Sequence, residues 1–252
     1  MAKSINMKLI QKFTGIFFAL LIICTPFNAH AQGAQKVTIY RDDSGWKLLV
    51  DGEDFYVKGV VWGYSPRGEN YTYNLWGKSD EFIKKVLEHD FGLMKKAGVN
   101  AIRAFSTIPP KWVTYIYEEY GIMTAINPLM GRYGATIDGA WKPQTDYSDP
   151  RTREVLKEEV LEIVKKFKNT PGVLMFALGN ESNYGLEWSA SFEIENLPEG
   201  ERQTEKARYL YSLYNEIITA GKAIDPNRPF TIVNGDIQYI DLIREYVTEL
   251  DL

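Results

Sequence analysis

The sequence predicts an α/β fold in which helices flank a parallel sheet, and three observations support this class. Residues 172–178 form an apolar run without polar alternation, which is typical of a strand buried on both faces. Similar runs alternate with amphipathic helical patterns, as they do in βαβ units. Long aromatic loops follow the predicted strands at 64–78, 128–148 and 182–199, whereas the opposite loops are short. This asymmetry favours a (β/α)8 TIM barrel with its site on one face; a doubly wound sheet is the alternative, but no Gly-x-Gly-x-x-Gly loop supports it.

The first 31 residues have the pattern of a secretory signal peptide. Lys3, Lys8 and Lys12 precede an apolar stretch at 15–24, and Ala-His-Ala at 29–31 is a small-x-small cleavage pattern. The apolar stretch is short for a membrane span, although an uncleaved anchor is the alternative. We therefore expect cleavage after residue 31, a secreted or periplasmic protein, and no stable membrane insertion after cleavage.

Composition narrows the possible chemistry. The one cysteine, Cys24, lies in the predicted signal, and His89 is the one histidine outside it. A thiol nucleophile is thereby excluded, and a Ser-His-Asp triad or a multi-histidine metal site has little support. The formal charge of −4 falls by three when the signal lysines are removed, which argues against nucleic-acid binding. Carboxylates remain for acid–base work, and we expect no metal and no cofactor.

A short β lead-in is predicted before the barrel. Three β-rich runs separated by turn residues follow the signal at 37–40, 46–50 and 55–57. We expect residues 32–54 to form an N-terminal β-hairpin lead-in and residues 55–252 to form an incomplete barrel domain. The third run continues into 59–63, which is predicted to be the first buried strand.

The remaining elements follow from apolar periodicity and cap residues. Further strands are predicted at 99–105, 121–127, 172–178 and 230–233. Ser79 can cap a helix that ends before Gly98, with an inner face of Ile83, Val86, Leu87, Leu93, Met94 and Ala97. Pro109-Pro110 opens a short helix through Tyr120, and Asp149-Pro150 opens one whose stripe contains Leu156, Val160, Ile163, Val164 and Phe167. Two more helices are expected at about 201–223 and 237–247.

The number of strands is smaller than a complete barrel requires. A (β/α)8 barrel has eight strands in about 250 residues. Five are predicted here, and residues 249–252 resemble the opening of a sixth. We therefore expect about five to six strands of a partial (β/α)8 TIM barrel and a chain that ends inside the domain.

The strongest candidate for catalysis is Glu181. It follows the buried run at 172–178, and the carboxyl ends of parallel strands are where α/β folds place their chemistry. The apolar strand before it and the aromatic residues around it suggest a partly desolvated carboxyl group, which suits a general acid. Glycoside hydrolysis needs such a group together with a second carboxylate.

Other strand ends supply residues that suit a sugar, whose faces are apolar and whose rim carries hydroxyl groups. Asn180 can donate to a hydroxyl beside the reacting carbon, and Arg103 can order a carboxylate or hydroxyl group. Further candidates for substrate binding are Trp62, Tyr64, Asn127 and Asn234, with Arg132, Tyr133 and Asp236 nearby. Each has a structural alternative: Arg103 can form an internal ion pair, Trp62 and Tyr64 can pack, and Asp236 can cap the helix predicted from Ile237.

Three segments in order give a resemblance to a known group of enzymes. These are Tyr-Val-Lys-Gly-Val at 56–60, Gly-Val-Asn-Ala-Ile-Arg at 98–103, and Leu-Gly-Asn-Glu at 178–181. The pattern is similar to the barrel domain of glycoside hydrolase family 2 in clan A, and it also resembles the glucanosyltransferases of family 72. The resemblance implies that Glu181 is the proton donor and that Arg103 and Asn180 shape the site. It also implies a glutamate nucleophile after a seventh strand, which this chain does not reach, and β-sandwich domains before the barrel, which are absent here.

The expected function is hydrolysis of O-glycosidic bonds in an oligo- or polysaccharide by a retaining carboxylate-pair mechanism, with this chain carrying the acid/base half. Two alternatives stay open. The chain can be a carbohydrate-binding barrel fragment without catalysis, or a glycan-remodelling transglycosylase, which uses the same two carboxylates. The expected partner is therefore a carbohydrate substrate, with no nucleic acid.

Overall fold

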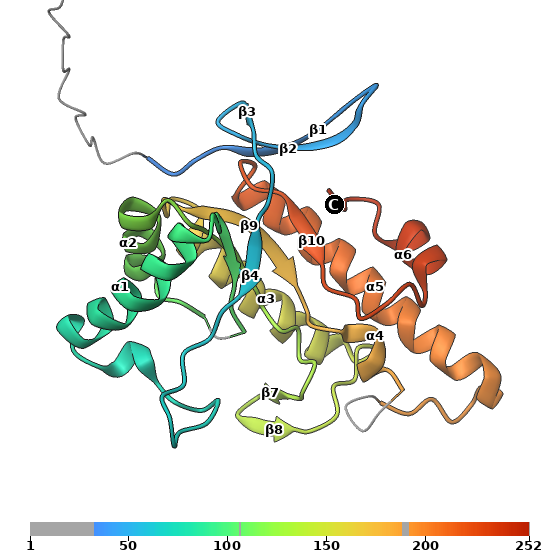
Figure 1. Ribbon diagram of the computed structural model, residues 1–252. Helices are drawn as coiled ribbons and strands as arrows, with labels where there is room; N and C mark the ends of the chain where they lie inside the picture. The colour runs from blue at the N-terminus through green and yellow to red at the C-terminus, as the bar shows by residue number, and fades with distance from the viewer. Residues whose placement is uncertain (1–32, 106, 188–191, 252) are drawn as a thin grey trace, which may run out of the picture. The chain divides into compact units, whose positions relative to one another are not determined.

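Five parallel strands form the main sheet of this computed structural model, which describes residues 33–105, 107–187 and 192–251 (Figure 1). The strands are β4 (Gly59–Val61), β5 (Ala101–Arg103), β6 (Met123–Ile126), β9 (Val173–Leu178) and β10 (Phe230–Ile232). Each strand pairs with the next strand of this sheet along the chain, giving the order β10-β9-β6-β5-β4, and β7 and β8 form a separate sheet. A doubly wound sheet reverses its order part-way, so that alternative is excluded for these strands. The predicted signal peptide lies outside the described residues.

The strands differ in burial. In β9, the side chains of Val173, Phe176 and Leu178 are fully buried, as the apolar run predicted, and Phe176 stacks on Phe230 of β10 with ring centroids 5.0 Å apart. The prediction of a buried first strand is wrong, because Val60 and Val61 of β4 are 40% and 56% exposed. β4 lies at the edge of the described sheet, where β5 is its one strand neighbour.

Helices lie between successive strands of this sheet, and one more helix follows β10. They are α1 (Asp80–Lys96), α2 (Pro110–Tyr120), α3 (Pro150–Phe167), α5 (Glu199–Ile224) and α6 (Ile240–Tyr246). The side chains of Ser79 and Asp149 cap α1 and α3 as predicted, by accepting from the Phe82 and Thr152 amides. α1 packs beside α2, and α3 packs along α5 (Figure 1). None of the helices in the described part of the chain is long and apolar enough to cross a membrane.

Two helices depart from the prediction. In α1, Phe91 is fully buried whereas Leu93 is 55% exposed and Ala97 is exposed. Each residue advances about 100° around a helix, so the Leu93 side chain lies about 200° from that of the buried Phe91. α6 begins at Ile240 rather than at residue 237, and Ile237 is 83% exposed.

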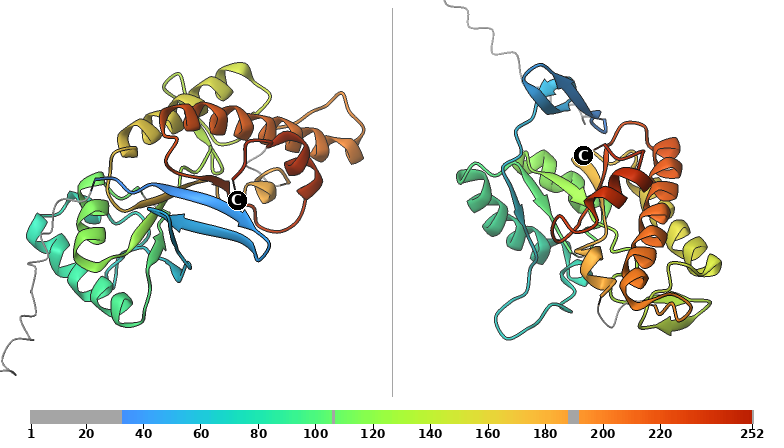
Figure 2. Two further views of the ribbon diagram at one scale, coloured as in Figure 1. Left: turned by 90° about the horizontal axis from the view of Figure 1, so that it is seen from above. Right: turned by 90° about the vertical axis from the view of Figure 1, so that its right-hand side faces the viewer.

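A three-stranded antiparallel sheet precedes the main sheet. It contains β1 (Val37–Asp42), β2 (Gly45–Val50) and β3 (Glu53–Asp54), so the third strand lies before the predicted run at 55–57. Val37 joins a small apolar cluster with Ala101, Met123 and Leu174, which lie at the starts of β5, β6 and β9. This sheet therefore covers the amino ends of the parallel strands. It lies at the opposite end of the described molecule from β7 and β8 (Figures 1 and 2).

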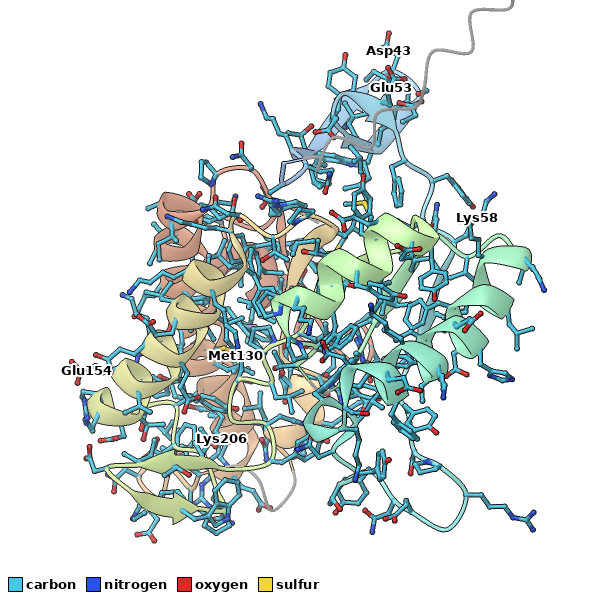
Figure 3. The ribbon with its side chains drawn as sticks, turned by 90° about the vertical axis from the view of Figure 1, so that its left-hand side faces the viewer. Asp43, Glu53, Lys58, Met130, Glu154 and Lys206 are labelled. Carbon is cyan, nitrogen blue, oxygen red and sulfur yellow. The ribbon has the colours of Figure 1, made fainter. Side chains whose placement is uncertain are left out.

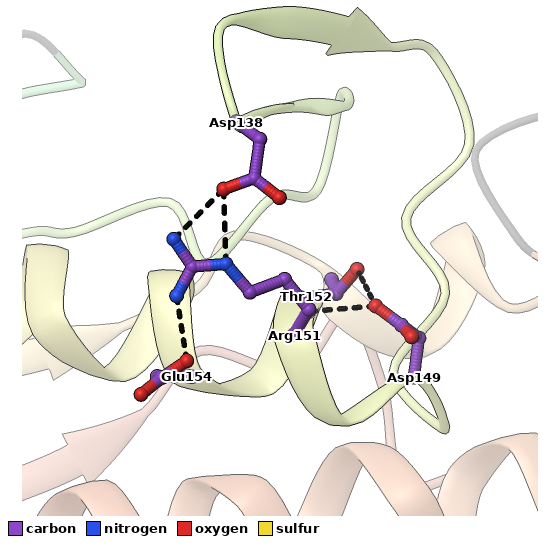
Figure 4. A network of polar contacts seen from close by, with 5 residues as sticks. All are labelled: Asp138, Asp149, Arg151, Thr152 and Glu154. Atoms are coloured by element: carbon purple, nitrogen blue, oxygen red, sulfur yellow. Dashed lines mark hydrogen bonds and ion pairs between the residues drawn. The ribbon is translucent and has the colours of Figure 1, made fainter.

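The long loop at 128–148 contains a hairpin that the sequence did not reveal. β7 (Ala135–Ile137) pairs with β8 (Ala140–Lys142) around Asp138 and Gly139, which both have positive φ, as an Asp-Gly hairpin turn requires. Arg151 of α3 donates to Asp138 Oδ1 at 2.8 and 3.0 Å and to Glu154 at 2.6 Å (Figure 4). This contact holds the pKa of Asp138 below its usual value and fastens the hairpin to α3.

No sixth strand is present among the described residues after α6. Residues 249–251 are irregular, and Leu252 is outside the described residues. Asp251 nevertheless lies beside the start of β10: its amide donates to the Phe230 carbonyl at 3.2 Å, and its carboxylate accepts from the Phe230 amide at 2.9 Å.

Candidate active site

The segment after β9 is held by backbone contacts. Gly179 has a φ of +78°, and its amide donates to the carbonyl of Pro128 at 2.7 Å. The side-chain nitrogen of Asn127 donates to the carbonyls of Ala177 and Gly179 at 2.5 and 2.7 Å. Asn127 therefore joins the end of β6 to the end of β9, and its Oδ1 is buried without a hydrogen-bond partner among the described residues.

Arg103, Asn180 and Tyr133 form a hydrogen-bonded chain across this end of the sheet. The Arg103 guanidinium donates to Asn180 Oδ1 at 2.8 Å, and Asn180 Nδ2 donates to the Tyr133 hydroxyl at 3.1 Å. Phe105 covers the guanidinium with its ring centroid 5.0 Å away. The Nε of Arg103 is buried without a partner in the described part of the chain. The structure thus brings Arg103 and Asn180 together. Among the described residues, Arg103 binds an amide side chain and does not form the internal ion pair that was its structural alternative.

Glu181 has a fixed backbone and an exposed side chain. Its φ and ψ are +51° and +42°, in the left-handed region that few residues with a side chain adopt. The Nε of Arg132 donates to the Glu181 carbonyl at 3.1 Å, and the next residue, Ser182, shares a buried hydrogen bond of 2.6 Å with the Tyr214 hydroxyl. The expected partial desolvation of Glu181 is not observed, because the residue is exposed at the start of α4 (Ser182–Gly185).

Two other predicted residues, Trp62 and Asn234, have structural partners. The indole of Trp62 is buried against Phe91 of α1, with ring centroids 5.0 Å apart, and its N–H donates to Asp90 at 3.0 Å. Asn234 accepts from the Tyr211 hydroxyl at 3.0 Å and donates to the Gln238 carbonyl at 3.1 Å. Trp62 thus packs in the core, and Asn234 fixes the loop after β10.

Asp236 fixes the same loop. Its Oδ1 accepts from Asn183 Nδ2 at 2.9 Å and from the Gln238 amide at 2.8 Å. It does not cap α6, which begins at Ile240. Among the described residues, no group of three or more His, Cys, Asp or Glu side chains is arranged to hold a metal ion.

A cavity of about 830 Å³ opens beside the Arg103–Asn180–Tyr133 chain. Asn180 and Tyr64, which the sequence suggests as substrate-binding residues, line it, and Glu181 is not among its lining residues although it adjoins Asn180. Its walls are Gly63, Tyr64, Ser65, Tyr71, Tyr73, Phe105, Leu129, Tyr133 and Asn180. The sequence prediction missed Tyr71, Tyr73 and Phe105 as individual residues, although the aromatic content of the loop at 64–78 was the signal that could have identified them.

Parallel strands in sequential order, with a polar network and a cavity at their carboxyl ends, define a (β/α)-barrel domain of the kind that carries enzyme sites. Residues 44–250 match the family described as glycosyl hydrolases family 2, TIM barrel domain, and the chain belongs to this family. The predicted resemblance to family 2 and the partial barrel fold are both confirmed.

The curated relatives are glycosidases of much greater length. The chain is 26% identical over 201 residues to the β-glucuronidase of Mus musculus, covering 80% of this chain and 25% of that protein. It is 27% identical over 169 residues to a β-galactosidase of Pectobacterium atrosepticum, covering 66% of this chain and 14% of that protein. The chain therefore spans a quarter or less of the length of these relatives.

Solved structures show the same fold. The crystal structure of the Bacteroides uniformis β-glucuronidase superimposes with a TM-score of 0.55 and 14% identity, covering 82% of this chain and 21% of that chain. The Parabacteroides merdae β-glucuronidase with glycerol in its active site gives a TM-score of 0.53 and 13% identity, covering 83% of this chain and 22% of that one.

Proposed function

We propose that this chain takes part in the hydrolysis of O-glycosidic bonds in an oligo- or polysaccharide, with Glu181 as the proton donor. The observation that carries this proposal is the position of Glu181: it follows Asn180 at the carboxyl end of β9, and Asn180 is bound to Arg103 beside an aromatic cavity. The family membership and the glycosidase relatives support the reaction class.

The chemistry assigned to Glu181 is proton transfer to the glycosidic oxygen while the bond to the anomeric carbon breaks. The developing positive charge on the sugar needs a second carboxylate, which acts as a nucleophile in a retaining enzyme. In the retaining mechanism that we propose, this second group would lie about 5 to 5.5 Å from Glu181. Of the described residues, Asp236 also follows a strand, but Asn183 and Gln238 already bind its carboxylate.

The residues around Glu181 are suited to hold a sugar. Asn180 lines the cavity, and its amide is oriented by Arg103 on one side and Tyr133 on the other. Below the cavity, the buried Arg103 Nε and Asn127 Oδ1 have no hydrogen-bond partner in the described part of the chain, and neither residue lines the cavity. Leaving such groups unpaired costs about 1–3 kcal/mol each, which a bound water or hydroxyl group would recover.

The test is Glu181→Gln in a protein that also contains the second carboxylate, assayed with unactivated β-glycosides and with aryl β-glycosides whose leaving groups need little protonation. General acid catalysis contributes roughly 10²- to 10⁴-fold, so hydrolysis of the unactivated substrates should fall by that factor, and that of the aryl glycosides should fall less. Glu187→Gln, in the same segment, is the matched control and should keep its activity. Equal rates for Glu181→Gln and its wild-type parent on unactivated substrates would contradict the proposal. Product analysis with an added acceptor sugar separates hydrolysis from transglycosylation.

A carbohydrate-binding role without catalysis is the second candidate. The aromatic cavity favours binding, and the exposed Glu181 lies outside the lining of that cavity. Binding of an oligosaccharide without turnover, by a protein that contains the second carboxylate, would establish this role.

We also propose that the protein is exported to the periplasm or the medium, on the basis of the signal pattern in its first 31 residues. Cell fractionation and N-terminal sequencing test this. The exported protein should begin at Gln32, and a cytoplasmic protein that starts at Met1 would overturn it.

A further inference from the structure

The cavity beside Asn180 extends over the ends of four consecutive strands. Tyr64 follows β4, Phe105 follows β5, Tyr133 follows β6, and Asn180 follows β9. Neighbouring strands are about 4.8 Å apart, so the three gaps between these strands amount to about 14 Å along the sheet. This width exceeds that of a single pyranose ring. A volume of about 830 Å³ also lies in the upper part of the usual range for small-molecule pockets, roughly 300–1,000 Å³.

The far wall of the cavity is made of tyrosines from the loop between β4 and α1. Tyr64 and Tyr73 contact each other edge to face, with ring centroids 5.8 Å apart, and Tyr71 is 96% exposed. In Figure 3 this loop extends at the same end of the molecule as β7 and β8, away from Asp43 and Glu53 of the first hairpin. A fully exposed ring on a cavity wall is available to stack on a ligand.

The loop that carries Tyr71 is folded by its own contacts. The Asn70 side chain accepts from the Thr72 amide at 2.9 Å, and the Asn70 carbonyl accepts from the Ser65 hydroxyl at 3.0 Å. The Lys78 ammonium lies 5.0 Å from the centroid of the Tyr73 ring, and Leu75 is buried in the core. These contacts lie on both sides of Tyr71 in the chain and hold the turn that carries its exposed ring.

We propose that Tyr64, Tyr71 and Tyr73 form a second sugar-binding subsite, separate from the position beside Asn180, so that the ligand is an oligosaccharide of at least two units. The apolar face of a sugar ring stacks on the tyrosine rings, while its rim hydroxyl groups contact the phenol oxygens and the Ser65 hydroxyl. This inference rests on the proposed function for the first sugar position. It adds the residues that bind the second sugar unit.

Isothermal titration calorimetry tests the subsite on a Glu181→Gln background, in which bound sugars stay intact. The probes are glucose, galactose, and their β-linked oligomers of two to four units. In one of these series the affinity should rise about tenfold or more between one unit and two or three units. A tenfold change in affinity corresponds to about 1.4 kcal/mol, which is within the range that one aromatic contact contributes at a binding site.

The additional substitution Tyr71→Ala should remove most of that increase. Tyr56→Ala is the matched control, because Tyr56 is 82% exposed and lies before β4, at the other end of the strand. Equal affinity for one unit and for longer oligomers, unchanged length dependence in Tyr71→Ala, or no binding of any probe would each overturn the subsite. Hydrolysis by the wild-type chain is measured separately, so a failure of catalysis and a failure of the subsite give different results.

Discussion

The Arg103 guanidinium and the Asn180 side-chain oxygen are 2.8 Å apart, although 77 residues separate them along the chain. Arg103 ends β5 and Asn180 follows β9, and β6 lies between these strands in the sheet. The hydrogen bond therefore spans β6 and joins the carboxyl ends of β5 and β9. Because Asn180 directly precedes Glu181, this contact also holds the backbone in place immediately before Glu181.

The first prediction concerns that contact. Asn180→Leu keeps the approximate volume but leaves the half-buried Arg103 guanidinium without its side-chain acceptor. A buried polar group that loses its partner costs about 1–3 kcal/mol, so the free energy of unfolding should fall by that amount in urea titrations. Asn196→Leu, at an exposed position, should change it by less than about 0.5 kcal/mol. Equal stabilities for the two variants would show that the Arg103–Asn180 bond contributes nothing.

The second prediction concerns Gly179, where an added Cβ would lie 2.1 Å from the Tyr214 hydroxyl and 2.3 Å from Ser182 Oγ. Gly179→Ala should cost about 1–2 kcal/mol for left-handed backbone strain and about 1–3 kcal/mol more for overpacking. Gly121 separates the two terms, because its φ is also positive but no atom lies within 4 Å of an added Cβ. Gly121→Ala should therefore show the strain alone. Thermal unfolding of both variants measures the difference, and equal losses would refute the steric contribution.

The third prediction concerns alkaline pH. Burial raises the pKa of Tyr147, Tyr211 and Tyr214, and it raises that of Tyr120 to about 12. Above about pH 10 the tyrosines of the unfolded chain lose their protons while these four keep theirs. The unfolded state then binds fewer protons than the folded state, so the free energy of unfolding decreases as the pH rises. Urea titrations from about pH 9 to pH 12 should show this decline, with a shallower slope for Tyr214→Phe. A flat profile would contradict it.

The fourth prediction concerns the cap of α3. Asp149 accepts from the Thr152 amide at 2.7 Å and from its hydroxyl at 2.8 Å, and these bonds lower the pKa of Asp149. Asp149→Ala should reduce stability by about 1 kcal/mol at neutral pH. The pKa is lower in the folded state, so this contribution is present above the unfolded value of about 3.9 and is lost as the pH falls through the folded value. Ser79→Ala should cost less, because the Ser79 cap bond is longer at 3.3 Å. If Asp149→Ala lost the same stability at acidic and at neutral pH, the charge of the Asp149 carboxylate would make no contribution to the cap.

Local chemistry determined how well each helix and strand could be predicted. Asp149-Pro150 and the apolar stripe that follows gave both the start and the buried face of α3, because capping and periodicity act within a few residues. The β7–β8 hairpin was missed because its strands have three residues each, too few to show a period. Burial of β4 depends on what covers the sheet edge, which a run of valines cannot reveal.

The site was predictable in its position but less so in its contacts. A carboxylate after a buried strand located Glu181, and the placement of Arg103 and Asn180 at strand ends indicated that they could meet. An aromatic residue after a strand can face the cavity or the helices. Tyr64 lines the cavity, whereas Trp62 packs against Phe91 of α1. Asn127 and Asn234 were expected to bind substrate, but each makes backbone contacts that are visible only once the strands are assembled.

The left-handed backbone of Glu181 has a consequence for directed evolution of this domain. Glycine and asparagine adopt that conformation at lower cost than glutamate, so replacing Glu181 with either relieves strain of about 1 kcal/mol or more. A screen for heat-resistant variants would therefore enrich substitutions at the position that we propose donates the proton, and would discard activity while improving yield. Libraries built to make this domain more robust should hold residue 181 constant.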